Sequence, residues 1–167
     1  MRKINLDLKD KSYDIKIGNN IIDLSNVEKF VSNKEVLIVF DSAISGSRIM
    51  QFKEMISKSI LKLKLIEIDA NENNKSQETL SEIHSILVEN KFSRDCLIIG
   101  MGGGIVCDIA GFSAATYQRG VNFFLIPTTL LAQVDASVGG KTAINHPKGK
   151  NMIGAFHQPI GVIADTS

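Results

Sequence analysis

The sequence has no tryptophan, only two cysteines and only three prolines among its 167 residues. Cys96 and Cys107 lack the spacing of a metal site, so we expect two buried thiols rather than a disulfide. No apolar run reaches the roughly 18 residues that a membrane span needs, and the N-terminus lacks the apolar core of a signal peptide. The net charge is +1, without a basic block, which gives no indication of nucleic acid or a membrane surface. We expect a soluble, cytoplasmic protein.

Charge is also scarce in the second half of the chain. Only eight charged side chains occur from residue 95 to 167, while eleven of the thirteen glycines lie between Gly100 and Gly161. Such a stretch is expected to be mostly buried, and a buried charge is costly unless it is paired. The few charged residues that remain there are therefore candidates for chemistry.

Short apolar runs alternate with helical patterns along the chain. Strands are predicted over 3–8, 13–17, 36–40, 63–68, 97–99, 123–126 and 162–164, the first two as an edge hairpin. Helices are predicted near 21–31, 47–61, 76–91 with Ser76 as N-cap, 106–116, and from Leu130. This alternation predicts an α/β fold, a Rossmann-like, doubly wound and mostly parallel sheet with an N-terminal β-hairpin.

A glycine-rich turn joins the strand at 97–99 to the next helix. Its pattern Gly102-x-Gly104-x-x-Cys107 departs from the dinucleotide fingerprint only at the last position. Glycines let the backbone approach a phosphate, and the helix dipole favours an anion. The turn therefore predicts a pyrophosphate site, although a turn that merely connects strand and helix gives the same pattern.

Further motifs follow in order. They are Gly102-Gly-Gly-Ile-Val-Cys-Asp108, Tyr117-Gln-Arg-Gly120, Ile126-Pro-Thr-Thr through Asp135 to Lys141-Thr, and Gly149-Lys-Asn-Met-Ile-Gly-Ala-Phe-His-Gln-Pro159. This succession resembles the 3-dehydroquinate synthase family of sugar-phosphate cyclases, strongly from about residue 95 and loosely before it. The family enzyme is about twice as long, so the resemblance implies that residues 1–167 form its NAD-binding N-terminal domain.

The resemblance implies roles for particular residues. The implied catalytic or substrate-binding residues are Lys141, Arg119, Asp135 and Asn151, with Arg119 reaching a phosphate in a neighbouring subunit. The implied cofactor-binding residues are Asp41, Asn71, Glu72, Lys75, Gly103, Gly104, Ile105, Val106, Cys107, Asp108, Thr128, Thr129, Lys141 and Lys150. In the segment 71–75 three family residues are replaced by asparagine, which alters the expected loop.

The family also implies the reaction. The substrate would be 3-deoxy-D-arabino-heptulosonate 7-phosphate, converted to 3-dehydroquinate and phosphate through transient NAD-dependent oxidation, elimination, re-reduction and aldol closure in the shikimate pathway. A divalent metal, Zn or Co, would be held by a C-terminal helical domain whose ligands are not in this chain. We expect a homodimer for the full-length enzyme and NAD binding without turnover for residues 1–167 alone.

Other interpretations of these residues remain. Asp108 could be a structural carboxylate, Thr128 and Thr129 an N-cap pair, and Arg119 part of a surface ion pair. His84 is expected on the solvent side of its helix. A metal-dependent alcohol or polyol dehydrogenase shares the Gly-Gly-Gly-x-x-x-Asp element but lacks the block 149–156, and a binding or assembly module without turnover is a third possibility.

Overall fold

The computed structural model describes all 167 residues as an α/β domain. Its strands are β1 (Arg2–Leu6), β2 (Tyr13–Gly18), β3 (Glu35–Asp41), β4 (Lys62–Ile68), β5 (Leu97–Gly102), β6 (Asn122–Pro127), β7 (Lys141–His146), β8 (Gly149–Phe156) and β9 (Val162–Asp165). Its α-helices are α1 (Leu24–Val31), α2 (Gly46–Ile56), α3 (Gln77–Glu89) and α4 (Gly104–Thr116). None of these helices is both long and apolar enough to cross a membrane.

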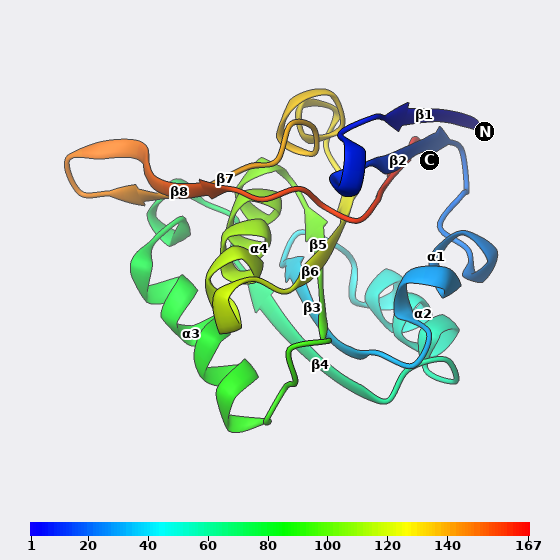
Figure 1. The fold of residues 1–167 in the computed structure, drawn as a ribbon, viewed down its shortest axis with the longest axis horizontal. Helices are drawn as coiled ribbons and strands as arrows, with labels where there is room; N and C mark the ends of the chain where they lie inside the picture. Colours follow the sequence, from blue (N-terminus) through cyan, green and yellow to red (C-terminus); the bar gives the residue numbers. More distant parts are fainter.

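Seven strands form the main sheet in the order β1-β2-β9-β6-β5-β3-β4. Only β1 runs antiparallel to its neighbour, so the expected edge hairpin and mostly parallel sheet are confirmed. Figure 1 shows α1 and α2 on one side of this sheet and α3 and α4 on the other. The doubly wound arrangement is therefore confirmed.

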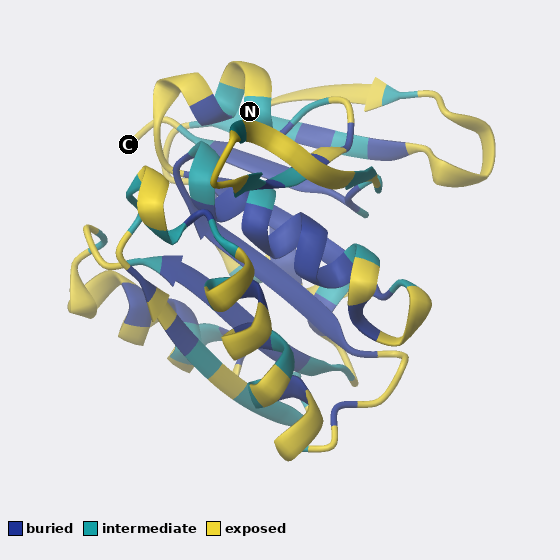
Figure 2. Ribbon diagram, turned by 90° about the vertical axis from the view of Figure 1, so that its left-hand side faces the viewer, coloured by how far each residue is buried: buried dark blue, intermediate teal, exposed yellow.

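Two hydrophobic cores lie on the two faces of the sheet, and β3 contributes to both. Leu37 and Val39 pack in the core beneath α3 and α4, whereas Ile38 and Phe40 pack beneath α1 and α2. Successive side chains of a strand point to opposite faces, so an unbroken apolar run is what a strand covered on both sides requires. Figure 2 shows the central strands buried along most of their length.

Several predicted boundaries need correction. The helix predicted over 47–61 ends at Ile56, because the Leu61 N–H already donates to the Lys34 carbonyl oxygen as the chain enters β4. The first helix begins at Leu24 instead of near Ile21. The helix from Leu130 is short and ends in the π-helical turn η4 (Ala132–Ala136). Ser76 caps α3 as predicted, its hydroxyl accepting from the Thr79 N–H.

The antiparallel hairpin of β7 and β8 was not predicted. It lies outside the main sheet, packs against α4 and α3, and extends beyond them (Figure 1). Gly111 of α4 makes this contact close, because a Cβ there would overlap Thr142 Cγ2 and lie 3.1 Å from the Phe123 ring. The hairpin thereby carries the second half of the sequence motifs to the start of α4.

Candidate functional site

The turn between β5 and α4 presents unpaired backbone donors. Gly103 is the N-cap and provides no side-chain cap, and the N–H groups of Gly104, Ile105 and Val106 find no acceptor within the chain. Gly102 is required beneath them, because a Cβ there would lie 2.9 Å from Val106. Free N–H groups and the dipole of a 13-residue helix make this terminus suitable for an anion.

Cys107 takes the position of the fingerprint's last glycine. Its side chain is buried, and its Sγ lies 3.7 Å from the Gly102 carbonyl oxygen. Burial raises the pKa of this thiol to about 12, so it stays protonated and unreactive at neutral pH. Cys96 is buried as well, and both thiols are free, as predicted. Cys107 would therefore contact a ligand only through its backbone in the first turn of α4.

A cavity of about 740 Å³ lies beside the glycine turn at the carboxyl edge of the sheet. Asp41, Thr128 and Thr129, three predicted cofactor residues, line it together. The Thr129 hydroxyl also accepts from the Ala132 N–H at 3.2 Å, so it caps the short helix while facing the cavity. Thr129 is close to the turn, since a Cβ on Gly103 would lie 3.4 Å from its methyl group. Ligands of open α/β folds bind at this edge.

Arg48 lines the same cavity from α2 and was missed by the sequence analysis. It stands in an ordinary polar stretch of an amphipathic helix, and no motif marks it. Its position could be found only once the packing of α2 against the strand ends was known.

A second cavity, of about 460 Å³, gathers four predicted residues from different elements. Asp108 comes from α4, Asp135 from η4, Lys141 from β7 and Asn151 from β8. Apolar groups of the hairpin, including Met152 and Phe156, complete its lining. The structure therefore places three of the four predicted catalytic or substrate-binding residues, Asp135, Lys141 and Asn151, around one hollow with the predicted cofactor residue Asp108.

Buried Lys75 connects two of these residues. Its side chain is 6% exposed, and its ammonium donates to Asp108 Oδ2 and to Asn151 Oδ1. Burial raises the pKa of the Asp108 carboxyl, while the hydrogen bond from Lys75 acts in the opposite direction. Lys75 was predicted to contact a cofactor, but in this structure its ammonium is engaged in joining α4 to the hairpin.

The segment before Lys75 is also tied to the hairpin. The Asn71 side chain caps its own turn by accepting from the N–H groups of Asn73 and Asn74. Glu72 Oε2 accepts from Asn145 Nδ2 at 2.8 Å and lies 3.5 Å from Lys150 Nζ. The hydrogen bond from Asn145 is the main reason that the pKa of Glu72 is lowered. Glu72, Lys75 and Lys150 line a further hollow of about 600 Å³.

Arg119 lies apart from the other predicted residues. It follows the C-terminal end of α4, whereas the glycine turn is at the N-terminal end of this 13-residue helix, about 20 Å away at 1.5 Å per residue. Its exposed guanidinium makes no ion pair or hydrogen bond in this chain, so the surface ion pair considered for it is absent. Arg119 therefore lines neither of the two cavities within its own chain.

The histidines and acids do not form a metal site. No group of three or more His, Cys, Asp or Glu side chains gathers anywhere in the chain. His84 was expected on the solvent side, but it is half-buried, with Nε2 3.0 Å from the Thr116 hydroxyl of α4. His157 Nε2 donates to the Val121 carbonyl oxygen at 2.8 Å.

The doubly wound sheet, the uncapped glycine-rich helix start and the polar cavity beside it form an α/β domain whose free backbone donors suit an anionic ligand. Residues 65–167 match the family described as 3-dehydroquinate synthase N-terminal. The chain belongs to this family.

Curated relatives carry the same name. The 3-dehydroquinate synthase of Hydrogenovibrio crunogenus is 44% identical over 167 residues, which are 99% of this chain and 46% of that protein. That of Ruthia magnifica subsp. Calyptogena magnifica is 45% identical over 168 residues, with the same coverage. The chain therefore spans about half the length of the curated relatives it matches.

Solved structures of sugar-phosphate cyclases share the fold. The 2-epi-5-epi-valiolone synthase of Streptomyces hygroscopicus subsp. jinggangensis, solved with NAD+ and Zn2+ bound, has a TM-score of 0.83 and 29% identity over 96% of this chain and 44% of that one. A 2-deoxy-scyllo-inosose synthase has a TM-score of 0.88 at 24% identity, covering 99% of this chain and 46% of its own. The latter likeness concerns the fold alone.

Proposed function

We propose that this chain is the NAD-binding domain of a 3-dehydroquinate synthase, a lyase that converts 3-deoxy-D-arabino-heptulosonate 7-phosphate to 3-dehydroquinate and phosphate. One observation carries the proposal. Asp108, Asp135, Lys141 and Asn151, from four separate elements, surround one cavity next to α4, the helix whose first turn carries the unpaired donors. The identity of about 44% to 3-dehydroquinate synthases supports the same assignment.

The residues present fit a dinucleotide. The free N–H groups of Gly104, Ile105 and Val106 would hold its diphosphate, because backbone donors at a helix start suit an anion. Asp41, at the end of β3, would accept hydrogen bonds from ribose hydroxyls. Its Oδ1 accepts from the Ala43 N–H, and its other carboxylate oxygen has no donor within the chain. A nicotinamide dinucleotide held by these groups would supply reversible hydride transfer, the chemistry that the proposed elimination of phosphate requires.

The chain's own side chains would orient the substrate. Asn151, held by Lys75, and Asp135 would hydrogen-bond the sugar hydroxyls, and the Lys141 ammonium would stabilise negative charge that develops in the cavity. Lys141 has no ion-pair partner in the chain, so its charge is available to a ligand. Lys150, paired only loosely with Glu72, would add positive charge on the cofactor side.

The residues of this chain do not fit the family's divalent metal, because no suitable group of ligands gathers here. We therefore assign no step of this chain to the metal and expect its ligands in a helical domain outside these 167 residues. Arg119 would bind the substrate phosphate in the cavity of a second subunit, which implies a homodimer. We expect the enzyme in the cytoplasm. Residues 1–167 alone would bind NAD without turnover.

The rival dehydrogenase function is disfavoured by the hairpin. The block 149–156, which such enzymes lack, forms β8 and supplies Asn151 to the cavity. A dehydrogenase would also release an oxidised product and consume NAD+. The cyclase leaves the cofactor unchanged, so the two functions differ in net cofactor turnover.

The test is phosphate release from the heptulosonate phosphate by the full-length protein, measured with and without NAD+. We expect NAD-dependent release without net NADH, and a loss of at least 100-fold on Lys141→Ala because the transition-state charge is no longer offset. Lys148→Ala, on the turn of the same hairpin and outside the three cavities described above, serves as the matched control. An unchanged rate of phosphate release for Lys141→Ala would contradict the proposed role of Lys141. Net formation of NADH would favour the dehydrogenase function.

A further inference from the structure

The backbone just after α4 is held in an unusual conformation. Gln118, Arg119 and Gly120 have φ angles of 46°, 69° and 117°. Non-glycine residues rarely adopt positive φ, and two in succession persist only where surrounding contacts fix them. The exposed Arg119 side chain makes no such contact itself. The conformation must therefore be fixed by its neighbours.

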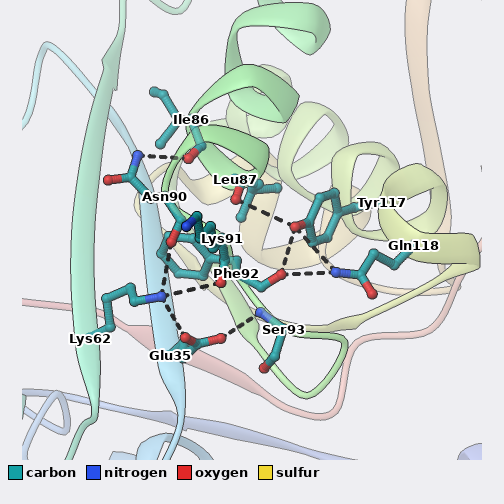
Figure 3. Close-up of polar contacts among 10 residues, drawn as sticks. All are labelled: Glu35, Lys62, Ile86, Leu87, Asn90, Lys91, Phe92, Ser93, Tyr117 and Gln118. Atoms are coloured by element: carbon teal, nitrogen blue, oxygen red, sulfur yellow. Dashed lines mark hydrogen bonds and ion pairs between the residues drawn. The ribbon is translucent and has the colours of Figure 1, made fainter.

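Two side chains fix this turn through one carbonyl oxygen, as Figure 3 shows. The Tyr117 hydroxyl donates to the Phe92 carbonyl oxygen at 2.7 Å, and Gln118 Nε2 donates to the same oxygen at 2.9 Å. Gln118 Nε2 also lies 3.3 Å from the Tyr117 hydroxyl oxygen. The two residues before Arg119 are thus held from the loop between α3 and β5.

The acceptor loop is itself secured to the sheet. Lys62 Nζ donates to Glu35 Oε1 at 2.6 Å and to the Asn90 carbonyl oxygen at 2.9 Å (Figure 3). The other oxygen of Glu35 accepts from the Ser93 N–H at 2.5 Å. Phe92 is 2% exposed, so its carbonyl has little freedom to move. A continuous set of bonds therefore runs from β3 and β4 to the Arg119 turn.

We propose that Gln118 is a positioning residue that fixes the direction in which Arg119 leaves the subunit, through the Phe92 carbonyl oxygen. The ligand it serves is a phosphate monoester in the cavity of a second copy of this chain, which Arg119 cannot reach in its own copy. This inference rests on the proposed function, since it requires that Arg119 binds substrate phosphate. A guanidinium binds phosphate through a planar fork, so its direction decides the affinity.

The test measures KM and kcat of the full-length enzyme for the phosphorylated substrate. We expect Gln118→Ala to raise KM about 5- to 10-fold, and Tyr117→Phe to change it in the same direction. Tyr117→Phe keeps the buried ring and provides a second readout if Gln118→Ala does not fold. The double variant Gln118→Ala/Arg119→Ala should be no worse than Arg119→Ala alone, because Gln118 acts only through the arginine.

Asn90→Ala is the matched control. It removes an amide-to-carbonyl hydrogen bond of 2.8 Å to Ile86 in the same loop without touching the Phe92 carbonyl, and it should leave KM unchanged. Additive effects in the double variant, or a normal KM for both Gln118→Ala and Tyr117→Phe, would overturn the inference while leaving the proposed function intact. A normal KM for Arg119→Ala would overturn the inference together with the phosphate role of Arg119, whereas NAD-dependent phosphate release would still decide the function.

Discussion

The ammonium of Lys75 lies buried between groups of two different elements, Asp108 of α4 and Asn151 of β8. A buried carboxylate that loses its partner charge must either remain unpaired or take up a proton. Lys75 thus controls both the charge of Asp108 and the place of Asn151. Its contribution belongs to the geometry of the site as much as to stability.

We expect Lys75→Met to lower the free energy of unfolding by about 2–3 kcal/mol, since it leaves a largely buried carboxylate unpaired. Adding Asp108→Asn should restore part of this loss. Lys150→Met is the matched control, because Lys150 and its partner Glu72 are both mostly exposed, and about 0–1 kcal/mol is expected there. Denaturant unfolding of the full-length protein measures all three, and equal losses for Lys75 and Lys150 would contradict the account.

Glu35 gives a prediction about acid stability. The hydrogen bonds from Lys62 and from the Ser93 N–H lower the pKa of Glu35 to about 2. The folded pKa lies below the unfolded one, so this stabilisation is present above about pH 4.5 and is lost as pH falls toward 2. We expect Glu35→Gln to lower the free energy of unfolding by about 1–2 kcal/mol at neutral pH. Between about pH 4.5 and 2, the free energy of unfolding of the variant should depend less on pH than that of the parent protein. The measurement is the free energy of unfolding of both proteins as a function of pH, and parallel curves would contradict this role of Glu35.

At the scale of elements, the close approach of α4 to β7 depends on one missing side chain. Helix propensity alone predicts that Gly111→Ala stabilises α4 by up to about 1 kcal/mol. A methyl group there would overlap Thr142, so we expect destabilisation by about 1–3 kcal/mol and a displaced hairpin. The measurement is the midpoint of thermal unfolding.

Gly46→Ala is the control for this prediction. Gly46 begins α2, and no neighbouring atom lies within 4 Å of the place that an alanine methyl group would take. Its φ angle is negative, so alanine there should be neutral or slightly stabilising. A higher unfolding midpoint for Gly111→Ala than for the parent protein would mean that α4 and β7 do not pack as closely as described.

The parallel strands could be predicted because a strand that is buried on both faces requires a short, uninterrupted apolar run, which is visible in the sequence. β3 reads Val36 to Phe40 without a polar residue, as a strand covered on both faces must. β7 and β8 carry no such run, since glycine, asparagine and lysine interrupt them and β8 is largely exposed. Their pairing depends on contacts with α4 that are distant in sequence, so the hairpin could not be predicted from its residues.

The same contrast holds for the site. The glycine turn, Asp41, Thr128 and Thr129 stand at strand ends, and strand ends can be located from the sequence. The hydrogen bonds of Lys75 and the position of Arg119 at the far end of α4 depend on tertiary packing, which the sequence does not reveal. Motif spacing gives the residue types, whereas the packing of the hairpin decides which of them meet.

At the scale of the whole molecule, the domain separates its tasks by position. The carboxyl edge of the sheet holds the cavity beside the unpaired donors, and the hairpin adds the polar residues of the second cavity. The opposite end of α4 presents Arg119 to the outside. The proposed function assigns the remaining chemistry to a further domain and to a second subunit.

In the proposed function, the free N–H groups at the start of α4 hold the diphosphate of a dinucleotide. Calorimetric titration of NAD+ into the full-length protein tests it most directly. We expect saturable binding that ADP-ribose competes away, and a loss of at least 10-fold in affinity on Gly104→Asp, which places a negative charge beside those donors. The absence of any binding heat at millimolar NAD+ would contradict it.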